Sequence, residues 1–248
     1  MLGGDWALHR GAAVFVDGPA TALTVQNNLF EQLNGNALML SNDVSYSNVL
    51  NNSFISIGES AMLAVGSSRL LDATAGKGRL PTKNLFEGNL VDSIGIYGKQ
   101  TSAYFKAVAR ENIFRRNVIF NGPRAGINFN DGAAGGEIVD GNLLFNFVRD
   151  SGDHGMFNSW DRQPYLYSSI DGDASSAVAS HPLTHQITNN FCLNKNYATT
   201  HTEFSLYCFD HDDGSSQYNS TGNVMYQGNP LLTFNRFETS SEFNMYIS

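Results

Sequence analysis

The sequence predicts an all-β fold, a single-domain right-handed parallel β-helix solenoid of roughly 8–10 coils that rises about 4.8 Å per coil. Two observations predict it: a repeated asparagine at the head of a short apolar run, and a second apolar run behind it. The repeated asparagines are Asn28, Asn52, Asn89, Asn117, Asn142, Asn190 and Asn223. They lie 24, 37, 28, 25, 48 and 33 residues apart. One repeat of about 25 residues therefore corresponds to one coil of a solenoid.

We expect each repeated asparagine to occupy a tight corner, because asparagine tolerates left-handed backbone geometry. At the same corner of successive coils, the side-chain amides can hydrogen-bond to one another along the solenoid. The second apolar run is clearest where Ile127, Asn128, Phe129 and Asn130 alternate apolar and polar. This alternation predicts that Ile127 and Phe129 point inward and that both asparagines point outward.

The repeat runs through the whole chain and predicts one β-helix domain over residues 1–248, with inserted loops near 66–84 and 163–184. The segment Ala13–Val16 already resembles a strand of an internal coil, although a solenoid needs a cap over its last coil. The start of the chain lacks the apolar segment of a signal peptide. We therefore expect a piece of a longer, secreted protein that acts outside the cell.

Composition limits the classes of partner. The net charge is -8 and charged residues make up 15% of the chain, which argues against nucleic acid and anionic membranes as partners. No run of 18 apolar residues is present, so the sequence predicts no membrane span. Two sequons begin at Asn51 and Asn219 and predict glycosylation there. Cys192 and Cys208 either form a disulfide across a coil or remain two buried thiols.

Three strands end with an aspartate in a similar setting, at Asp131, Asp161 and Asp213. Aligned on the repeat, the three carboxylates fall on one edge of neighbouring coils, about 5 Å apart. Like charges at this spacing raise at least one pKa, and two carboxyls about 5–5.5 Å apart are the pair that a retaining glycosidase uses. The alternative is that each aspartate is simply the turn residue that its strand needs.

The segment from Arg149 to Arg162 is the densest polar stretch of the chain. A tryptophan beside carboxylates and arginines suits a sugar-binding surface, whereas the alternative is a self-satisfied network at a corner. We predict Asp161 and Asp213 as the acid/base and nucleophile pair, with Asp153 and His154 in support. The predicted substrate-binding residues are Arg124, Asp131, Asn158, Trp160, Arg162 and His211.

The sequence predicts no cofactor and no zinc site. His181 and His185 lack a third ligand and are expected to face solvent. The alternative to a site without metal is Ca²⁺ held by Asp210, Asp212 and Asp213, although the spacing of an EF-hand is absent.

Four long motifs carry a resemblance to a known family; they span residues 97–105, 121–132, 152–162 and 210–215. They resemble extracellular right-handed β-helix proteins of aquatic microbes and some animals, mostly without assigned activity. More distantly, the chain is similar to pectin-lyase-like glycoside hydrolases and polysaccharide lyases, whose sites lie on a groove along the coils. One departure is Met156, where the family pattern has proline after glycine.

Together these patterns predict an extracellular carbohydrate-active protein, a glycoside hydrolase-like enzyme that acts on a polysaccharide. The rival hypothesis is a structural or adhesive component of a glycosylated extracellular fibre, wall or appendage. Unpaired strands at the end coils recruit further strands, so that hypothesis includes self-association by stacking.

Overall fold

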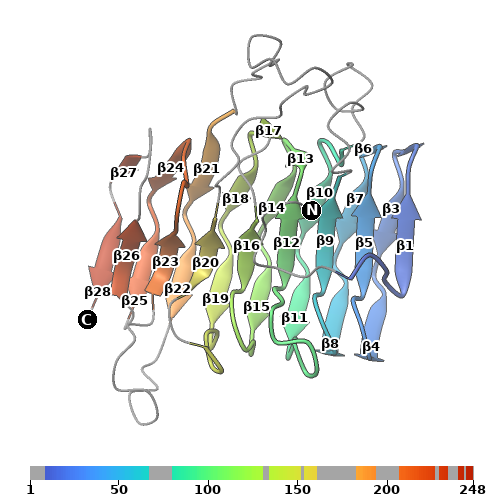
Figure 1. Cartoon of the computed structure of the whole chain (residues 1–248), viewed down its shortest axis with the longest axis horizontal. Coiled ribbons are helices and arrows are strands. Elements are labelled where there is room, and N and C mark those ends of the chain that lie inside the picture. The colour runs from blue at the N-terminus through green and yellow to red at the C-terminus, as the bar shows by residue number, and fades with distance from the viewer. Residues whose placement is uncertain are drawn as a thin grey trace, which may run out of the picture.

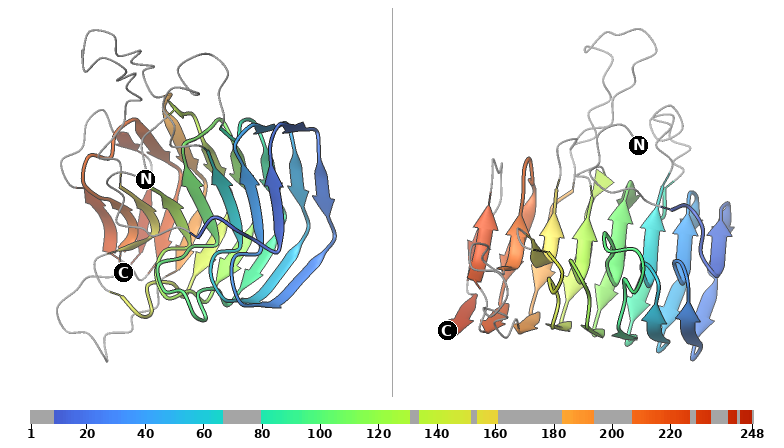
Figure 2. Two further views of the ribbon diagram at one scale, coloured as in Figure 1. Left: turned by 45° about the vertical axis from the view of Figure 1, so that its right-hand side comes forward. Right: turned by 60° about the horizontal axis from the view of Figure 1, so that its bottom comes forward.

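The computed structural model describes residues 9–66, 80–130, 134–151, 154–160, 183–193, 207–226, 229–233, 240–242 and 244–247. It confirms an all-β parallel β-helix, with three sheets of eight strands each (Figure 1). The chain visits the sheets in turn, so that each coil gives one strand to each sheet (Figure 2). Eight strands per sheet agree with the predicted number of coils.

Sheet 1 consists of β1 (Val14–Asp17), β5 (Leu38–Ser41), β9 (Met62–Val65), β12 (Tyr104–Ala107), β16 (Ile127–Phe129), β20 (Gly155–Ser159), β23 (Tyr207–His211) and β26 (Asn229–Thr233). Sheet 2 consists of β3 (Thr24–Gln26), β7 (Asn48–Leu50), β10 (Leu85–Glu87), β14 (Ile113–Arg115), β18 (Ile138–Asp140), β21 (His185–Thr188), β24 (Tyr218–Thr221) and β27 (Ser240–Glu242). Sheet 3 consists of β4 (Leu29–Leu33), β8 (Ser53–Ile57), β11 (Leu90–Asp92), β15 (Val118–Phe120), β19 (Leu143–Phe145), β22 (Phe191–Leu193), β25 (Val224–Tyr226) and β28 (Met245–Ile247).

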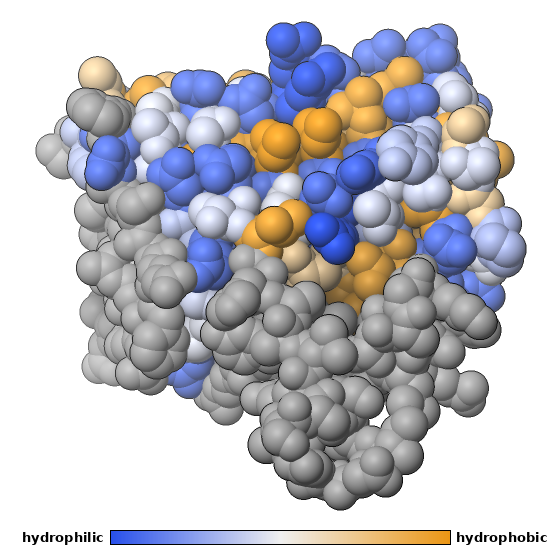
Figure 3. Space-filling view, turned by 90° about the horizontal axis from the view of Figure 1, so that it is seen from above, coloured by the Kyte–Doolittle hydropathy of each residue, from blue (hydrophilic) through white to orange (hydrophobic). Residues whose placement is uncertain are grey.

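Two short pairs lie at the corner between sheets 1 and 2. They are β2 (Ala20–Thr21) with β6 (Val44–Ser45), and β13 (Ala109–Arg110) with β17 (Ala134–Gly135). Seen from above in Figure 3, the described part of the molecule mixes apolar side chains (orange) with hydrophilic ones (blue). No helix among the described residues is long and apolar enough to cross a membrane.

The repeated asparagines form a continuous ladder at the corner between sheets 2 and 3, as predicted. Each side-chain amide donates to the Oδ1 atom of the asparagine on the next coil, at 2.9–3.1 Å, and Asn244 extends the ladder by one step. Most also donate to a backbone carbonyl, as Asn117 does to Phe86 at 3.1 Å. The buried corner is therefore satisfied by a column of identical amides.

The expected left-handed geometry belongs to a different residue. The residue before each of the seven predicted ladder asparagines has positive φ: Asn27, Asn51, Gly88, Arg116, Gly141, Asn189 and Gly222. The prediction placed this geometry on the ladder asparagine itself, and that assignment is wrong. The chain turns at the preceding residue, which leaves the asparagine side chain free to point into the corner.

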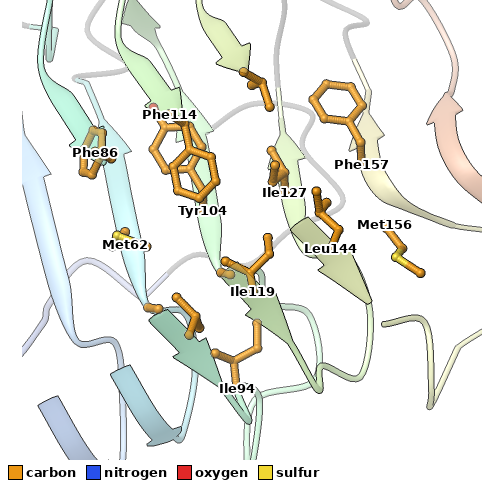
Figure 4. Packing of buried hydrophobic residues seen from close by; sticks show 14 of the residues in the cluster. Met62, Phe86, Ile94, Tyr104, Phe114, Ile119, Ile127, Leu144, Met156 and Phe157 are labelled. Carbon is orange, nitrogen blue, oxygen red and sulfur yellow. The ribbon is translucent and has the colours of Figure 1, made fainter. Parts of the chain in front are cut away.

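Inward-pointing side chains of the three sheets fill the solenoid. Phe129 and Ile127 are buried in the core cluster inside the solenoid, which confirms the predicted register of this strand. In Figure 4 the ring of Tyr104 lies against that of Phe114, with the centroids 4.7 Å apart. Cys192 of β22 and Cys208 of β23 form a disulfide that links sheet 3 to sheet 1 across the core.

Candidate functional site

The outward side of sheet 1 carries the clearest candidate site. Strand pairing aligns one row of outward positions: Met39, Leu63, Phe105, Asn128, Asn158 and Asp210. The row is apolar on its first three strands and polar on the last three. All six side chains are buried, so protein covers this side of the sheet as well as the inner side. The change from apolar to polar falls between β12 and β16.

The polar part of the row has hydrogen-bonding capacity to spare. The Asn158 amide donates to Asn128 Oδ1 at 3.1 Å. Asn128 Nδ2 and Asn158 Oδ1 are buried and have no hydrogen-bond partner among the described residues. An unpaired buried polar atom costs about 1–3 kcal/mol, so each such atom in a native structure calls for an explanation, of which a bound ligand, ion or water is one. One spare donor and one spare acceptor on neighbouring strands are suited to a hydroxyl-rich ligand.

A second outward row lies beside the first, at the ends of the same three strands. Trp160 follows β20 and is 7% exposed, and its backbone N–H donates to Phe129 O at 3.0 Å. Asp212 follows β23, and its backbone N–H donates to Ser159 O at 2.9 Å. Asp212 Oδ1 accepts from the Asp213 N–H at 2.6 Å, which fixes a turn with both carboxylates partly exposed.

The loops that connect sheet 3 to sheet 1 form the rim of this site. Arg124 donates through a terminal guanidinium nitrogen to His154 Nε2. Lys99 pairs with Asp150 at 3.0 Å, and both are exposed. Arg124 and His154 join neighbouring loops, whereas Lys99 and Asp150 join loops that are two coils apart, so the loops hold one another in place. These loops therefore place the cationic side chains of Lys99 and Arg124 and the imidazole of His154 beside the row of amides and carboxylates on sheet 1.

Several predicted residues lie outside the described ones: Asp131, Asp153, Asp161 and Arg162. Phe129, Ser159 and His211 are in register on β16, β20 and β23. These three residues lie two positions before Asp131, Asp161 and Asp213. The chain therefore enters each predicted aspartate from matching positions on neighbouring strands. The proposed roles of Asp161, Asp213, Asp153 and His154 stay predictions.

The predicted substrate-binding role of His211 is wrong. His211 points inward and is fully buried, and its Nδ1 lies 2.8 Å from Ser159 Oγ, which in turn lies 2.8 Å from Ser215 Oγ. Strand alternation decides this, because it turns Asp210 and Asp212 outward and the residue between them inward. His185 is likewise fully buried and does not face solvent.

A buried polar cluster inside the solenoid escaped the sequence analysis. At the corner between sheets 1 and 2, Asn84 donates to Asn112 at 2.9 Å, and Asn112 donates to Glu137 Oε1 at 3.0 Å. The next coil places His185 in this column, and its Nδ1 accepts from the Glu137 backbone N–H at 3.2 Å. In this second column, the asparagines are therefore followed by the titratable side chains of Glu137 and His185.

Burial raises the pKa of Glu137 to about 7, although the charge of Lys106 and the bonds from Asn112 and Tyr104 oppose this shift. Burial also lowers the pKa of His185 well below its usual value, and the charge of Lys106 adds to this shift. Lys106 is fully buried because it alternates with outward-facing Phe105 along β12. In the sequence, Lys106 lies two residues after Tyr104, and side chains two residues apart on a strand point to the same side. This spacing was the signal that Lys106 points inward.

The remaining predicted sites fall in different places. Asn51 is exposed at its corner, whereas Asn219 of β24 donates to Gln186 Oε1 at 2.9 Å, a bond that a glycan there would break. Among the described residues, no group of three His, Cys, Asp or Glu side chains is arranged to hold a metal ion. Ca²⁺ binding by Asp210, Asp212 and Asp213 stays a prediction.

No family model matches this chain, and no curated protein matches its sequence. Its fold is similar to that of a glycoside hydrolase (TM-score 0.63, 14% identity, 92% of this chain and 38% of the other). It is also similar to the Azotobacter vinelandii mannuronan C-5 epimerase AlgE6 A-module (TM-score 0.65, 11% identity, 92% of this chain and 54% of the other). A third is the alginate lyase from Paenibacillus sp. str. FPU-7 (TM-score 0.50, 12% identity, 90% and 78%). At these identities the likeness shows the fold alone, and the chain spans about a third to a half of the first two proteins.

Proposed function

We propose that this protein is a carbohydrate-active enzyme that cleaves a polysaccharide on the outward side of sheet 1. The observation that carries the proposal is the pair of partly exposed carboxylates, Asp212 and Asp213, at the end of a sheet side that carries Trp160 and a row of polar side chains. The three similar folds belong to a glycoside hydrolase, a mannuronan epimerase and an alginate lyase, which supports a glycan as the substrate class.

The reaction that we propose is hydrolysis by Asp161 and Asp213. Neighbouring strands of a sheet are about 4.8 Å apart, so two carboxyls at matching positions fall near the separation of a retaining pair. One carboxylate attacks the anomeric carbon, while the other, as a carboxylic acid, protonates the leaving oxygen. That second group then takes a proton from water, which opens the glycosyl ester and restores both carboxyls.

Within this proposal the described residues bind and orient the glycan. Trp160 offers an aromatic face to a sugar ring, and Arg124, hydrogen-bonded to His154, faces its polar edge. The Cys192–Cys208 disulfide supports an extracellular setting, since disulfides persist in oxidising compartments.

A second candidate function is the structural or adhesive one. It is favoured by the outer side of sheet 3, where strand pairing aligns an apolar row that includes Leu29, Leu90, Phe191 and Met245. These four side chains are 38–62% exposed. Ser53 interrupts this row on β8, and the apolar stretch from Leu90 onward suits packing against another surface.

The test is incubation of the full chain with a panel of neutral glucans, polymannuronate, alginate and pectin. Three readouts separate the chemistries: new reducing ends without unsaturation indicate hydrolysis, unsaturated uronates indicate a lyase, and altered uronate configuration by NMR indicates an epimerase. We expect new reducing ends from at least one polymer. If no polymer changes while the protein assembles into fibres or coats a glycan surface, the structural function replaces the enzyme.

A further inference from the structure

The outer side of sheet 3 carries two rows of side chains that are almost free of charge, here called the apolar strip. Strand pairing aligns the first row as Leu29, Ser53, Leu90, Val118, Leu143, Phe191, Val224 and Met245. The second row is Glu31, Ile55, Asp92, Phe120, Phe145, Leu193, Tyr226 and Ile247. From Phe30 to Met225, the residues between the two rows point inward and belong to the core cluster. Figure 1 shows the eight strands side by side.

The apolar strip is exposed at both ends and between them. Leu29 on the first strand is 62% exposed, and Met245 on the last strand is 57% exposed. Leu90 and Phe191, on strands between these two, are each 38% exposed. Apolar side chains that gather on one face of a protein, instead of being scattered singly, mark an interaction surface.

The two aromatic rings at the centre of the strip indicate the chemistry of its partner. Phe120 and Phe145 are stacked, with centroids 4.5 Å apart and ring planes 6° apart. Their faces therefore cover each other, and the ring edges are left to point away from the sheet. A sugar ring packs on an aromatic face, so this pair offers no platform for a glycan. Ring edges and aliphatic side chains instead suit the apolar side chains of another protein.

The shape of the strip limits which protein can cover it. Eight strands about 4.8 Å apart, with about three residues per strand, give a strip about 34 Å long and 10 Å wide. A rounded surface would contact only part of it, whereas a second solenoid with the same repeat contacts it along its length. The strip is smaller than the roughly 800 Å² that each partner contributes to a standard interface. We therefore expect a dimer of this chain that dissociates on dilution.

The two charged side chains of the strip favour one orientation of the second copy. Glu31 lies on the first strand and Asp92 on the third. Parallel solenoids would place each acid at the level of the same acid in the other copy, where like charges repel. An antiparallel arrangement shifts the two Asp92 side chains by three strands, about 14 Å along the axis. Leu29 of each copy then faces Met245 of the other.

We propose that two copies of this chain pack antiparallel through the apolar strip of sheet 3 and form a symmetric, reversible dimer. The dimer does not depend on the proposed function, because its partner lies away from the outward side of sheet 1. The chain carries a net charge of -8, and little of this charge lies on the strip. Salt screens the repulsion between the two copies, so the dimer is expected to tighten as the salt concentration rises.

Sedimentation equilibrium of the full chain, at several protein and salt concentrations, tests the dimer. Leu143→Lys places a charge at the centre of the strip, on a half-buried outward position, and is expected to weaken dimerisation at least about tenfold. Ile113→Lys is the matched control, because Ile113 is a half-buried outward residue of sheet 2, one coil earlier. The control is expected to dimerise like the parent. Thermal melts establish that both variants are folded.

Chemical crosslinking tests the orientation. A Leu29→Cys variant is mixed with a Met245→Cys variant and treated with a short bis-maleimide. The antiparallel dimer is expected to give a crosslinked product from the mixture and none from either variant alone. Crosslinking within Leu29→Cys alone would overturn the antiparallel arrangement.

Three outcomes of the sedimentation experiment would overturn the dimer itself. They are a monomer at every concentration, an association that weakens with salt, and equal effects of Leu143→Lys and Ile113→Lys. None of them bears on glycan cleavage, so this inference and the proposed function fail independently.

Discussion

The Phe129 side chain contacts aromatic side chains from several coils of the core. Its ring contacts those of Tyr104, Phe157, His185 and Tyr218, at centroid distances of 5.1–6.3 Å. We expect Phe129→Ala to lower the free energy of unfolding by about 3–5 kcal/mol, because it removes a large buried side chain and leaves a cavity. Denaturant unfolding of variant and parent measures this loss.

Phe120→Ala is the matched control for that variant. Phe120 lies on the previous coil, is stacked on Phe145 at 4.5 Å and is partly exposed on the outer side of sheet 3. Its truncation is expected to cost about 1 kcal/mol, in the range of an aromatic pair at a surface. Equal losses in the two variants would mean that the outer side of sheet 3 is covered as fully as the core.

Asp213 lies in a partly exposed turn and shares its surroundings with Asp212. We expect Asp213→Asn to abolish glycan cleavage while leaving the melting temperature equal to the parent's or higher, because it removes one of several neighbouring negative charges. Asp43→Asn, at an exposed corner far along the solenoid, is the control and should leave both unchanged.

A chelator separates this expectation from a structural calcium site. If Asp210, Asp212 and Asp213 hold Ca²⁺, Asp213→Asn should lower the melting temperature, and a chelator should lower that of the parent to match. That result would contradict the catalytic assignment of Asp213.

Among the elements, the asparagine ladder is the one that the sequence repeat encodes directly. Inside the ladder, Asn117 Oδ1 accepts from both the backbone N–H and the side-chain amide of Asn89, at 2.9 and 3.0 Å. We expect Asn117→Ala to cost about 2–4 kcal/mol, because two buried donors of Asn89 lose their acceptor. Thermal and denaturant unfolding measure this cost.

Asn28→Ala tests the same ladder at its first step. Asn28 is exposed and its side-chain amide donates to Asn52, and no hydrogen bond to the side-chain Oδ1 of Asn28 is formed by the described residues. Its removal is expected to cost less than about 1 kcal/mol, the usual net value of one hydrogen bond. If the two substitutions cost the same, the ladder's contribution would come from the corner conformation instead of from paired amides.

For the whole molecule, the buried cluster of Glu137 and His185 makes stability depend on pH in two opposite ways. The pKa of Glu137 is raised from 4.5 to about 7, so the folded state holds this proton more tightly. Its contribution is therefore full below pH 4.5 and is lost as the pH rises toward about 7. The pKa of His185 is lowered, so its stabilising effect is present above about pH 6.5 and is lost as the pH falls below that value.

We expect Glu137→Gln to gain stability relative to the parent by up to about 3 kcal/mol between pH 4.5 and 7, since one pKa unit is worth about 1.4 kcal/mol. His185→Gln should gain relative to the parent as the pH falls below 6.5, because the unfolded parent alone binds the extra proton. Free energies of unfolding at pH 4.5, 5.5, 6.5 and 7.5 test both slopes. A difference from the parent that does not vary with pH would show that the group does not titrate differently on folding.

How far the sequence determines the structure differs between the repeat and the site. The spacing of Asn28, Asn52 and Asn89 was sufficient to predict the coil. Each coil needs an asparagine at the same corner, so the residue recurs once per coil in the sequence. Alternation around Phe129 likewise placed Asn128 on the outward side. Both signals are local. Alternation along a strand fixes which side chains point inward, and the spacing of the asparagines fixes where each coil turns.

Long-range relations were decided only by the tertiary structure. Asp210 and His211 are neighbours in sequence, yet one faces the candidate site and the other the core, because the coil's register fixes which side is inward. Lys106 and Glu137 belong to different coils and meet inside the solenoid, and Arg10 contacts Gly66 more than fifty residues later. Burial and electrostatic coupling depend on the stacking of coils, so no single repeat contains them, whereas the repeat by itself determined the fold.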